Sequence, residues 1–414
     1  MTTADRASLR RLWVLMATAC VDMIGYMIVV PLLPFYATRF GATPALYGVL
    51  FACHPFAQLT TAPLWGRLSD RYGRRPMILA GLTVSIFAYA AFGLAETLWL
   101  LFAMRLLQGF GGGISGVVQA YVADSVPASE RTKALGWLTA AISGGGMLGA
   151  ALGSLVTPLG PQAPGFVAAG LCLTNVVSAF FFLPEPAPHD EPAGTVVPAR
   201  RTLRHSIAEV LRHPLAPVSS LVWIYTVGMM AFFALNGVFG LYLKDQFGVT
   251  QENIGYYFVY IAGASFLMRA LFLGPAVRRF GDVGVLRLGA LSLIAGLAIL
   301  PLLDRLPAVA IAVLSVPIGT ALLFPSTTSL ISRLVTRREA GQTLGVQQAF
   351  GGVSRMLGPL WAGAAYELGP RYPFWLAATL MLGVSFLTRQ IRQEPAKPPQ
   401  PAPVSPDTPA PEGL

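Results

Sequence analysis

Three polar side chains lie inside long apolar segments and could carry ionic chemistry. Asp22 lies in DMIGYMIVVPLLP, ten residues into the apolar run 12–37. Arg105 and Gln108, in RLLQGFGGGISG, are three residues apart and would share one face of a helix. A carboxylate inside an apolar span is costly, so it is a functional-site hypothesis by default. We interpret Asp22 as a proton carrier or a contact for a cationic substrate. The alternative is a structural acid paired with a helix end or an Arg.

Arg105 stays charged under all ordinary conditions, so it cannot itself release protons. It can bias the protonation of a nearby carboxylate, and Asp22 is the expected partner. Together, Asp22, Arg105 and Gln108 form the predicted proton-coupling set.

A second group of charges lies in the short segment GRLSDRYGRRP, residues 66–76, between two apolar runs. It contains four Arg and one Asp. Gly66 and Gly73 permit a tight backbone path, and Pro76 suits the first turn of the following helix. Because Lys and Arg resist translocation, we expect this loop on the cytoplasmic side of a membrane. By itself, such a basic loop sets the topology of the chain.

The composition requires that these groups be positioned by membrane helices. Of the 414 residues, 54% are hydrophobic and 12% charged, and the mean hydropathy is +0.61. Soluble domains carry roughly 25% charged residues. Repeated continuous apolar runs of about 20 residues indicate an all-α integral membrane protein. The net charge of +10 would suggest nucleic acid in a soluble protein, but its distribution along the chain has a better explanation, so no nucleic-acid partner is expected.

We predict twelve spans, and the basic residues orient them. The expected spans are 12–37, 44–65, 76–95, 98–122, 133–157, 164–183, 216–243, 251–274, 284–302, 307–332, 342–366 and 372–389. If both termini are cytoplasmic, 22 of the 29 Lys and Arg fall on the cytoplasmic side and four in outer loops. We therefore expect a multi-pass protein of the inner (plasma) membrane with both termini inside. The three Cys lie in apolar runs without metal-ligand spacing, so no metal site is expected.

The chain divides into two similar halves. We predict a six-helix bundle at 1–183, a cytoplasmic linker at 184–214 with a short helix near 203–211, a second bundle at 215–390 and a disordered Pro-rich tail at 391–414. The segment at Gly66 corresponds to one at Gly274, an offset of 208. ERTKALG at 130 corresponds to EAGQTLG at 339, an offset of 209, which places Gly149 opposite Gly358. Two parallel repeats predict a substrate site near the midplane between the halves.

Several of these segments resemble motifs of the major facilitator superfamily. Residues 66–76 fill every fixed position of its G-x-L-x-D-R-x-G-R-R loop. Residues 22–34 resemble the D-x-x-G-x(5)-P-x-x-P pattern of its twelve-span drug:proton antiporters, a group that includes the tetracycline exporters. Residues 105–109 resemble its R-x-x-Q-G motif. The resemblance implies a major facilitator fold of twelve transmembrane helices in two six-helix pseudo-repeats.

The resemblance also implies a cytoplasmic gate. In such a gate Asp70 would lie near the N-terminus of the eleventh span, where a helix dipole favours an anion. Arg74 would bridge to Asp124 and latch the outward-open state. The expected gate residues are Gly66, Asp70, Arg71, Gly73, Arg74, Arg75, Asp124 and Arg131.

In the fifth span, SGGGMLGAALGS resembles the exporter motif G-x-x-x-G-P-x-x-G-G. Gly145, Gly149 and Gly153 match, whereas Ala150 and Ser154 replace the motif's Pro and last Gly. That departure weakens the prediction of antiport. The other half carries Gly358 and Pro359 at the equivalent place. Simple packing of helices through small residues is the alternative interpretation.

Polar and aromatic residues within the spans are candidates for the substrate cavity. They are Tyr26, Gln58, Gln119, Phe232, Asn236, Tyr260, Gln347, Gln348 and Arg355. Arg355 would lie near the midplane, where it could meet an anionic group of the substrate, a helix-end carbonyl or water. Arg269 is expected to be structural, with its head group extended toward the cytoplasmic end.

These features predict a secondary transporter that exports small amphiphilic or hydrophobic compounds by alternating access. We expect a monomer in the bilayer that uses a proton gradient and no cofactor. No nucleophile–base pair is visible, so an enzyme is not expected. The alternative is a symporter or uniporter for an anionic lipid, sugar or metabolite, which three intramembrane Arg would suit. A non-transporting membrane receptor is a further alternative.

Overall fold

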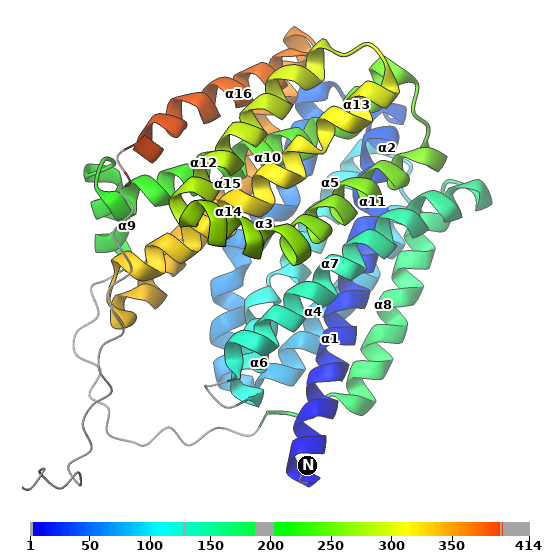
Figure 1. Cartoon of the computed structure of the whole chain (residues 1–414). Coiled ribbons are helices and arrows are strands. Elements are labelled where there is room, and N and C mark those ends of the chain that lie inside the picture. Colours follow the sequence, from blue (N-terminus) through cyan, green and yellow to red (C-terminus); the bar gives the residue numbers. More distant parts are fainter. Residues whose placement is uncertain (1–2, 127–129, 187–202, 390, 392–414) are drawn as a thin grey trace, which may run out of the picture.

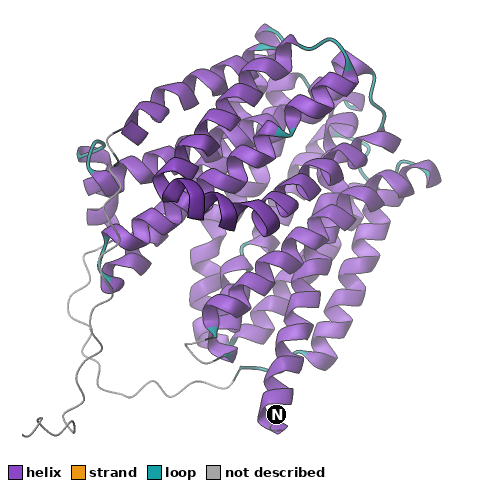
Figure 2. Ribbon diagram, in the orientation of Figure 1, coloured by secondary structure: helices purple, strands orange, loops and turns teal. Residues whose placement is uncertain are grey.

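The computed structural model describes residues 3–126, 130–186, 203–389 and 391. Within these ranges the chain forms helices and no strand (Figure 2). The predicted tail after residue 391 and the linker portion 187–202 lie outside the described residues. The all-α fold predicted from the sequence is confirmed.

The N-terminal half contains six spans, some made of more than one helix. In order they are α1 (Thr3–Val29) with η1 (Val30–Leu32) and α2 (Leu33–Arg39), α3 (Pro44–Tyr72), α4 (Arg74–Gly93), α5 (Leu98–Gly112) with α6 (Ser115–Ser125), α7 (Arg131–Val156) and α8 (Ala163–Phe182). The hydroxyls of Thr43 and Thr97 accept from backbone N–H groups at the starts of α3 and α5. They satisfy donors that have no partner within the helix.

The C-terminal half repeats this plan after the linker helix α9 (Leu203–Arg212), which covers the short helix predicted there. Its helices are α10 (Pro217–Phe247), α11 (Gln251–Leu267), the π-helical η3 (Met268–Phe272), α12 (Leu273–Ile299), α13 (Leu306–Val313), α14 (Ser315–Leu334), α15 (Arg337–Leu368) and α16 (Tyr372–Ser385). α12 turns sharply at Gly281 and so joins the end of the eighth span to the ninth. Among the described residues, eight segments are long and apolar enough to cross a membrane. α3, α15 and the 14-residue α16 are not among them.

The internal repeat is visible in the backbone. Gly73, between α3 and α4, has φ +99°, and Gly281 has φ +66° at the equivalent turn of the second half. Both positions favour glycine, because a Cβ is strained there. Their separation of 208 residues equals the offset of the repeat seen in the sequence.

The two halves meet at one end of the molecule and separate toward the other. We call the end that holds residues 66–76 the basic end and the end that holds residues 39–44 the opposite end. In Figure 1 the helices converge at the upper right, near α2 and α13, and diverge toward the N-terminus and α9. At the opposite end a Cβ on Gly48 of α3 would lie 2.4 Å from the carbonyl oxygen of Pro359 in α15. Such backbone contact leaves no room for water between the halves there.

Candidate functional site

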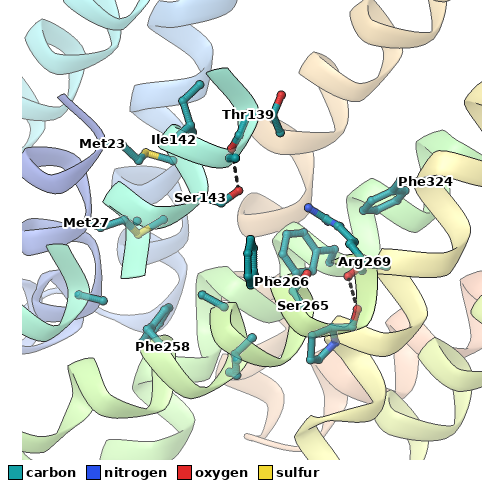
Figure 3. A pocket seen from close by; sticks show the side chains of 18 of the residues that line it. Met23, Met27, Thr139, Ile142, Ser143, Phe258, Ser265, Phe266, Arg269 and Phe324 are labelled. Atoms are coloured by element: carbon teal, nitrogen blue, oxygen red, sulfur yellow. Dashed lines mark hydrogen bonds between the residues drawn. The ribbon is translucent and has the colours of Figure 1, made fainter. Parts of the chain in front are cut away.

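A cavity of about 460 Å³ lies between the two halves. α1 and α7 form one wall, and α10, α11, η3 and α14 form the other (Figure 3). Its lining is mostly apolar and includes Met23, Met27, Phe258 and Phe324. The side chains that bring polar groups to the wall are Thr139, Ser143, Asn236, Ser265, Arg269 and Thr320. Such a lining suits a largely apolar molecule with a few polar groups.

The cavity lies on the basic side of the seal between the halves. A Cβ on Gly255 would lie 2.0 Å from the carbonyl oxygen of Ala150, so α11 and α7 touch at that level. The lining residues of α11 and η3 follow Gly255 toward the basic end, from Phe258 to Ala270. In α7 the lining reaches back from Ala150 to Gly136, near the helix start at the basic end. The cavity is therefore closed from the opposite end.

Two of the predicted cavity residues, Phe232 and Asn236, line this cavity. The Asn236 amide donates to the Phe232 carbonyl at 2.8 Å. Gln347 is fully buried between α14 and α15, where its amide donates to Thr327 at 3.3 Å. Gln348 lies beside Tyr225.

The remaining candidates lie elsewhere. Gln58 donates to the Gly112 carbonyl at 3.0 Å and so ties α3 to the end of α5. Tyr26 packs against the His54 ring in a tilted arrangement, with ring centroids 4.7 Å apart. Arg355 has a buried Nε without a hydrogen-bond partner among the described residues. Gln119 and Tyr260 are exposed.

Asp22 and Arg105 do not form the pair that the sequence suggested. Both residues are described, and no ion pair joins them in this structure. Asp22 is half-buried and directly precedes Met23, which lines the cavity. Arg105 is fully buried; its guanidinium donates to Gln108 at 2.9 Å and to the Phe51 carbonyl at 3.2 Å.

Pro55 explains where Arg105 points. Pro55 lies inside α3 and has no N–H, so the carbonyl four residues earlier, that of Phe51, loses its helical donor. The Arg105 guanidinium supplies the missing hydrogen bond and packs over the Phe51 ring, 5.5 Å from its centroid. The predicted ion pair with Asp22 would therefore compete with the hydrogen bond that Arg105 donates to the Phe51 carbonyl in this structure.

The predicted gate residues form a network at the basic end of the N-terminal half. Arg74 donates to Asp70 at 2.6 Å, to Asp124 at 3.1 Å and to Ser69 at 2.7 Å. These bonds join α3, α4 and α6. The start of α15, near which Asp70 was expected, is capped by the hydroxyl of its own Thr336. The network in this structure is thus internal to one half.

The other predicted gate residues also make contacts at the basic end of the N-terminal half. The Arg131 guanidinium donates to the Ala123 carbonyl at 3.0 Å. Arg75 donates to the Phe180 carbonyl, and Arg71 lies over the Tyr72 ring. The carbonyl of Gly66 accepts from Ser69.

Glu185 was not selected from the sequence because it falls in the predicted linker. Its carboxylate accepts from the backbone N–H groups of Arg74 and Arg75, at 2.5 and 2.9 Å, and so caps α4. An anion at a helix start is stabilised by unpaired N–H groups and the helix dipole. The one sequence feature that could have pointed to Glu185 is that it is an acid immediately after the sixth predicted span.

The glycines of the fifth span form a continuous contact with the first span. A Cβ on Gly145, Gly149 or Gly153 would lie 2.3, 2.4 or 2.6 Å from the carbonyl oxygen of Cys20, Ile24 or Ile28, respectively. In the other half, a Cβ on Gly358 would lie 2.7 Å from the Met230 carbonyl oxygen. The motif therefore brings α7 onto α1 and, at the equivalent position, α15 onto α10.

These features define a class of protein. Two six-helix repeats, sealed against each other at one end, with a cavity at their interface that is closed from that end, are the architecture of a secondary transporter.

Comparison with known proteins identifies the family. The chain belongs to the Major Facilitator Superfamily, whose sequence profile matches residues 15–317 and 270–412.

Relatives and structural neighbours agree with this family. The chain is 27% identical to multidrug resistance protein 2 of Bacillus subtilis (strain 168), over 92% of this chain and 96% of that protein. It is 28% identical to the class C tetracycline resistance protein of Escherichia coli, over 85% and 89% of the two chains. The fold is similar to that of a bacterial homolog of the human lysosomal transporter Spinster, crystallised inward-facing and unoccupied. Their TM-score is 0.75 at 14% identity, covering 93% of this chain and 97% of the other.

Proposed function

We propose that this major facilitator transporter exports small amphiphilic or hydrophobic compounds in exchange for protons. The observation that carries the proposal is the predominantly apolar cavity between the halves, one wall of which is formed by α1, the helix that carries Asp22. Asp22 is half-buried and directly precedes the cavity-lining Met23 in α1, so a proton on it would change the charge carried by a helix that forms one wall of the cavity. Multidrug and tetracycline resistance proteins among the relatives support the same substrate class.

In this proposal the basic end faces the cytoplasm of the inner membrane, with both termini inside. The structure would then be the inward-open state, which accepts substrate from the cytoplasm. Protonation and deprotonation of Asp22 would shift the balance between this state and the outward-open one. Arg105 would act indirectly, through the positions of Gln108 and of the first and second spans.

The test uses purified protein in proteoliposomes with a pH-sensitive dye inside and an imposed proton gradient. Cationic, neutral and anionic amphiphiles are added singly. Substrate-dependent proton flux is expected, opposite in direction to substrate movement and absent in Asp22→Asn. Glu252→Gln, at an exposed acid of the opposite end, is the matched control and should keep the flux.

Two results would contradict the proposal. Full proton-coupled flux in Asp22→Asn would exclude Asp22 as the carrier. Proton and substrate movement in the same direction would establish symport and so favour uptake over export.

A further inference from the structure

Arg269 is the one ionisable residue among those lining the cavity. It belongs to η3, the five-residue π-helical segment Met268–Phe272. Figure 3 shows its side chain extending from that segment toward the cavity, between Phe266 and Phe324. The sequence favoured a structural role for Arg269, with its head group extended toward the cytoplasmic end; in the structure the residue lines the cavity.

The position of Arg269 along the helix explains why its charge faces the cavity. Arg269 lies twelve residues before the turn at Gly281, or about 18 Å at 1.5 Å per residue. It lies still farther from the start of α11 at Gln251. A π-helical turn inserts an extra residue and changes the direction of the side chains that follow, and such turns are frequent at functional sites.

The charge of Arg269 is unpaired in the part of the chain that the structure describes. With the residues that the structure describes, its guanidinium makes neither a hydrogen bond nor an ion pair. The two other intramembrane arginines lie outside the cavity lining, and Arg105 has protein partners. A charged group in a membrane span is costly unless water, protein or ligand compensates it. An unpaired guanidinium in the wall of a substrate cavity is therefore available to a ligand.

We infer that Arg269 selects substrates that carry an anionic group on an apolar body. This inference rests on the proposed transport function and narrows its substrate class. The guanidinium offers two parallel N–H donors to a carboxylate or a comparable oxyanion. The apolar body would lie against Met23 and Met27 on the opposite wall, with Asn236 available for a further hydrogen bond.

The test compares three probes that share a two-ring body: 2-naphthoate, its methyl ester and 2-naphthylmethylammonium. Binding to the purified full-length protein is measured by calorimetry in detergent, without a proton gradient. We expect 2-naphthoate to bind about tenfold more tightly than the ester, equivalent to about 1.4 kcal/mol. Arg269→Gln should remove this preference, and Arg269→Lys, which keeps the charge but not the two parallel donors, should retain only part of it.

Arg278→Gln is the matched control, because Arg278 is exposed nine residues further along the same chain segment and does not line the cavity. It should leave the preference unchanged, and thermal unfolding should show that all variants are folded. An unchanged preference in Arg269→Gln would overturn the inference. So would tighter binding of the cation or the ester by the unaltered protein, or no binding of any probe.

Failure of this inference is distinguishable from failure of proton coupling. Asp22→Asn should keep the preference for 2-naphthoate, because the anion contact lies in the other half of the protein. A lost preference in Arg269→Gln combined with unchanged proton flux in Asp22→Asn would support the anion site while rejecting the carrier.

Discussion

The carboxylate of Glu367, at the end of α15, accepts a hydrogen bond from the backbone N–H of Ala45, at the start of α3, at 3.1 Å. The contact joins the C-terminal half to the N-terminal half at the opposite end. Hydrogen bonding to the Thr43 side chain, and then to the Ala45 backbone, lowers the pKa of the Glu367 carboxyl. An acid from one half thus caps a helix of the other.

This cap predicts that acid weakens the seal at the opposite end. A lowered pKa means that the contact is fully present above the ordinary Glu value of about 4.3 and is lost as the pH falls through the lower value. Glu367→Gln should weaken the seal already at neutral pH. The measurement is the distance between spin labels on Leu46→Cys and Leu368→Cys in a chain whose three native Cys are replaced. Longer distances should appear in Glu367→Gln but not in Glu252→Gln; identical distributions would show that the cap does not hold the halves.

The Arg74 network predicts unequal effects of its two acids on stability. Asp124 is less exposed than Asp70, with side chains 40% and 66% exposed. Asp124 also ties α6 to α4, whereas Asp70 is only four residues from Arg74 in the chain. Asp124→Asn should cost about 1 kcal/mol and Asp70→Asn less, because exposed ion pairs contribute little. Thermal unfolding in detergent measures both, and a larger loss in Asp70→Asn would indicate a further role for that residue.

The contact between Arg105 and the Phe51 carbonyl predicts energetic coupling to Pro55. Arg105→Met leaves a buried carbonyl without a donor, at a cost of about 1–3 kcal/mol. Pro55→Ala restores the helical N–H to that carbonyl, so the double variant should lose about 1 kcal/mol less than the sum of the single losses. Unfolding by denaturant of the four proteins measures this cycle. Strict additivity would mean that the carbonyl does not depend on Arg105.

The glycine contact between α7 and α1 predicts different responses from neighbouring glycines. Gly149→Ala should lower the unfolding temperature markedly, because its Cβ would lie 2.4 Å from a backbone oxygen that cannot move alone. Gly144→Ala is the matched control, since a Cβ there meets no atom within 4 Å. It should be neutral or slightly stabilising, because alanine is the better helix former. Equal losses in the two variants would argue against close packing at Gly149.

The sequence predicted the helices and their repeat well, because apolar length and motif spacing are local properties. The fourth span, expected as one segment, is broken between Gly112 and Ser115, and the eighth contains a π-helical turn at Met268–Phe272. Hydropathy detects neither the break nor the π-helical turn, because neither changes the mean polarity of its span.

The cavity was predicted less well for a related reason. Whether a polar residue faces the cavity depends on how its helix is rotated about its own axis. Gln347 and Arg269 are two examples, with opposite outcomes. Gln347 seemed suited to a substrate and is buried between helices, whereas Arg269 was assigned a structural role and lines the cavity. Likewise, the partner of Arg105 depends on a carbonyl freed by a proline in another helix.

The glycine contact also constrains how the transporter can move. Its three glycines place α7 against the backbone of α1 over two full helical turns, with no side chain in between that could change rotamer. Helices α1 and α7 can therefore translate and tilt together as one rigid unit, but they cannot slide past each other. Asp22 and the Thr139–Ser143 wall then keep a fixed separation throughout the transport cycle. In the proposed exchange mechanism, protonation of Asp22 would therefore act by changing how α1 and α7 together contact the C-terminal half.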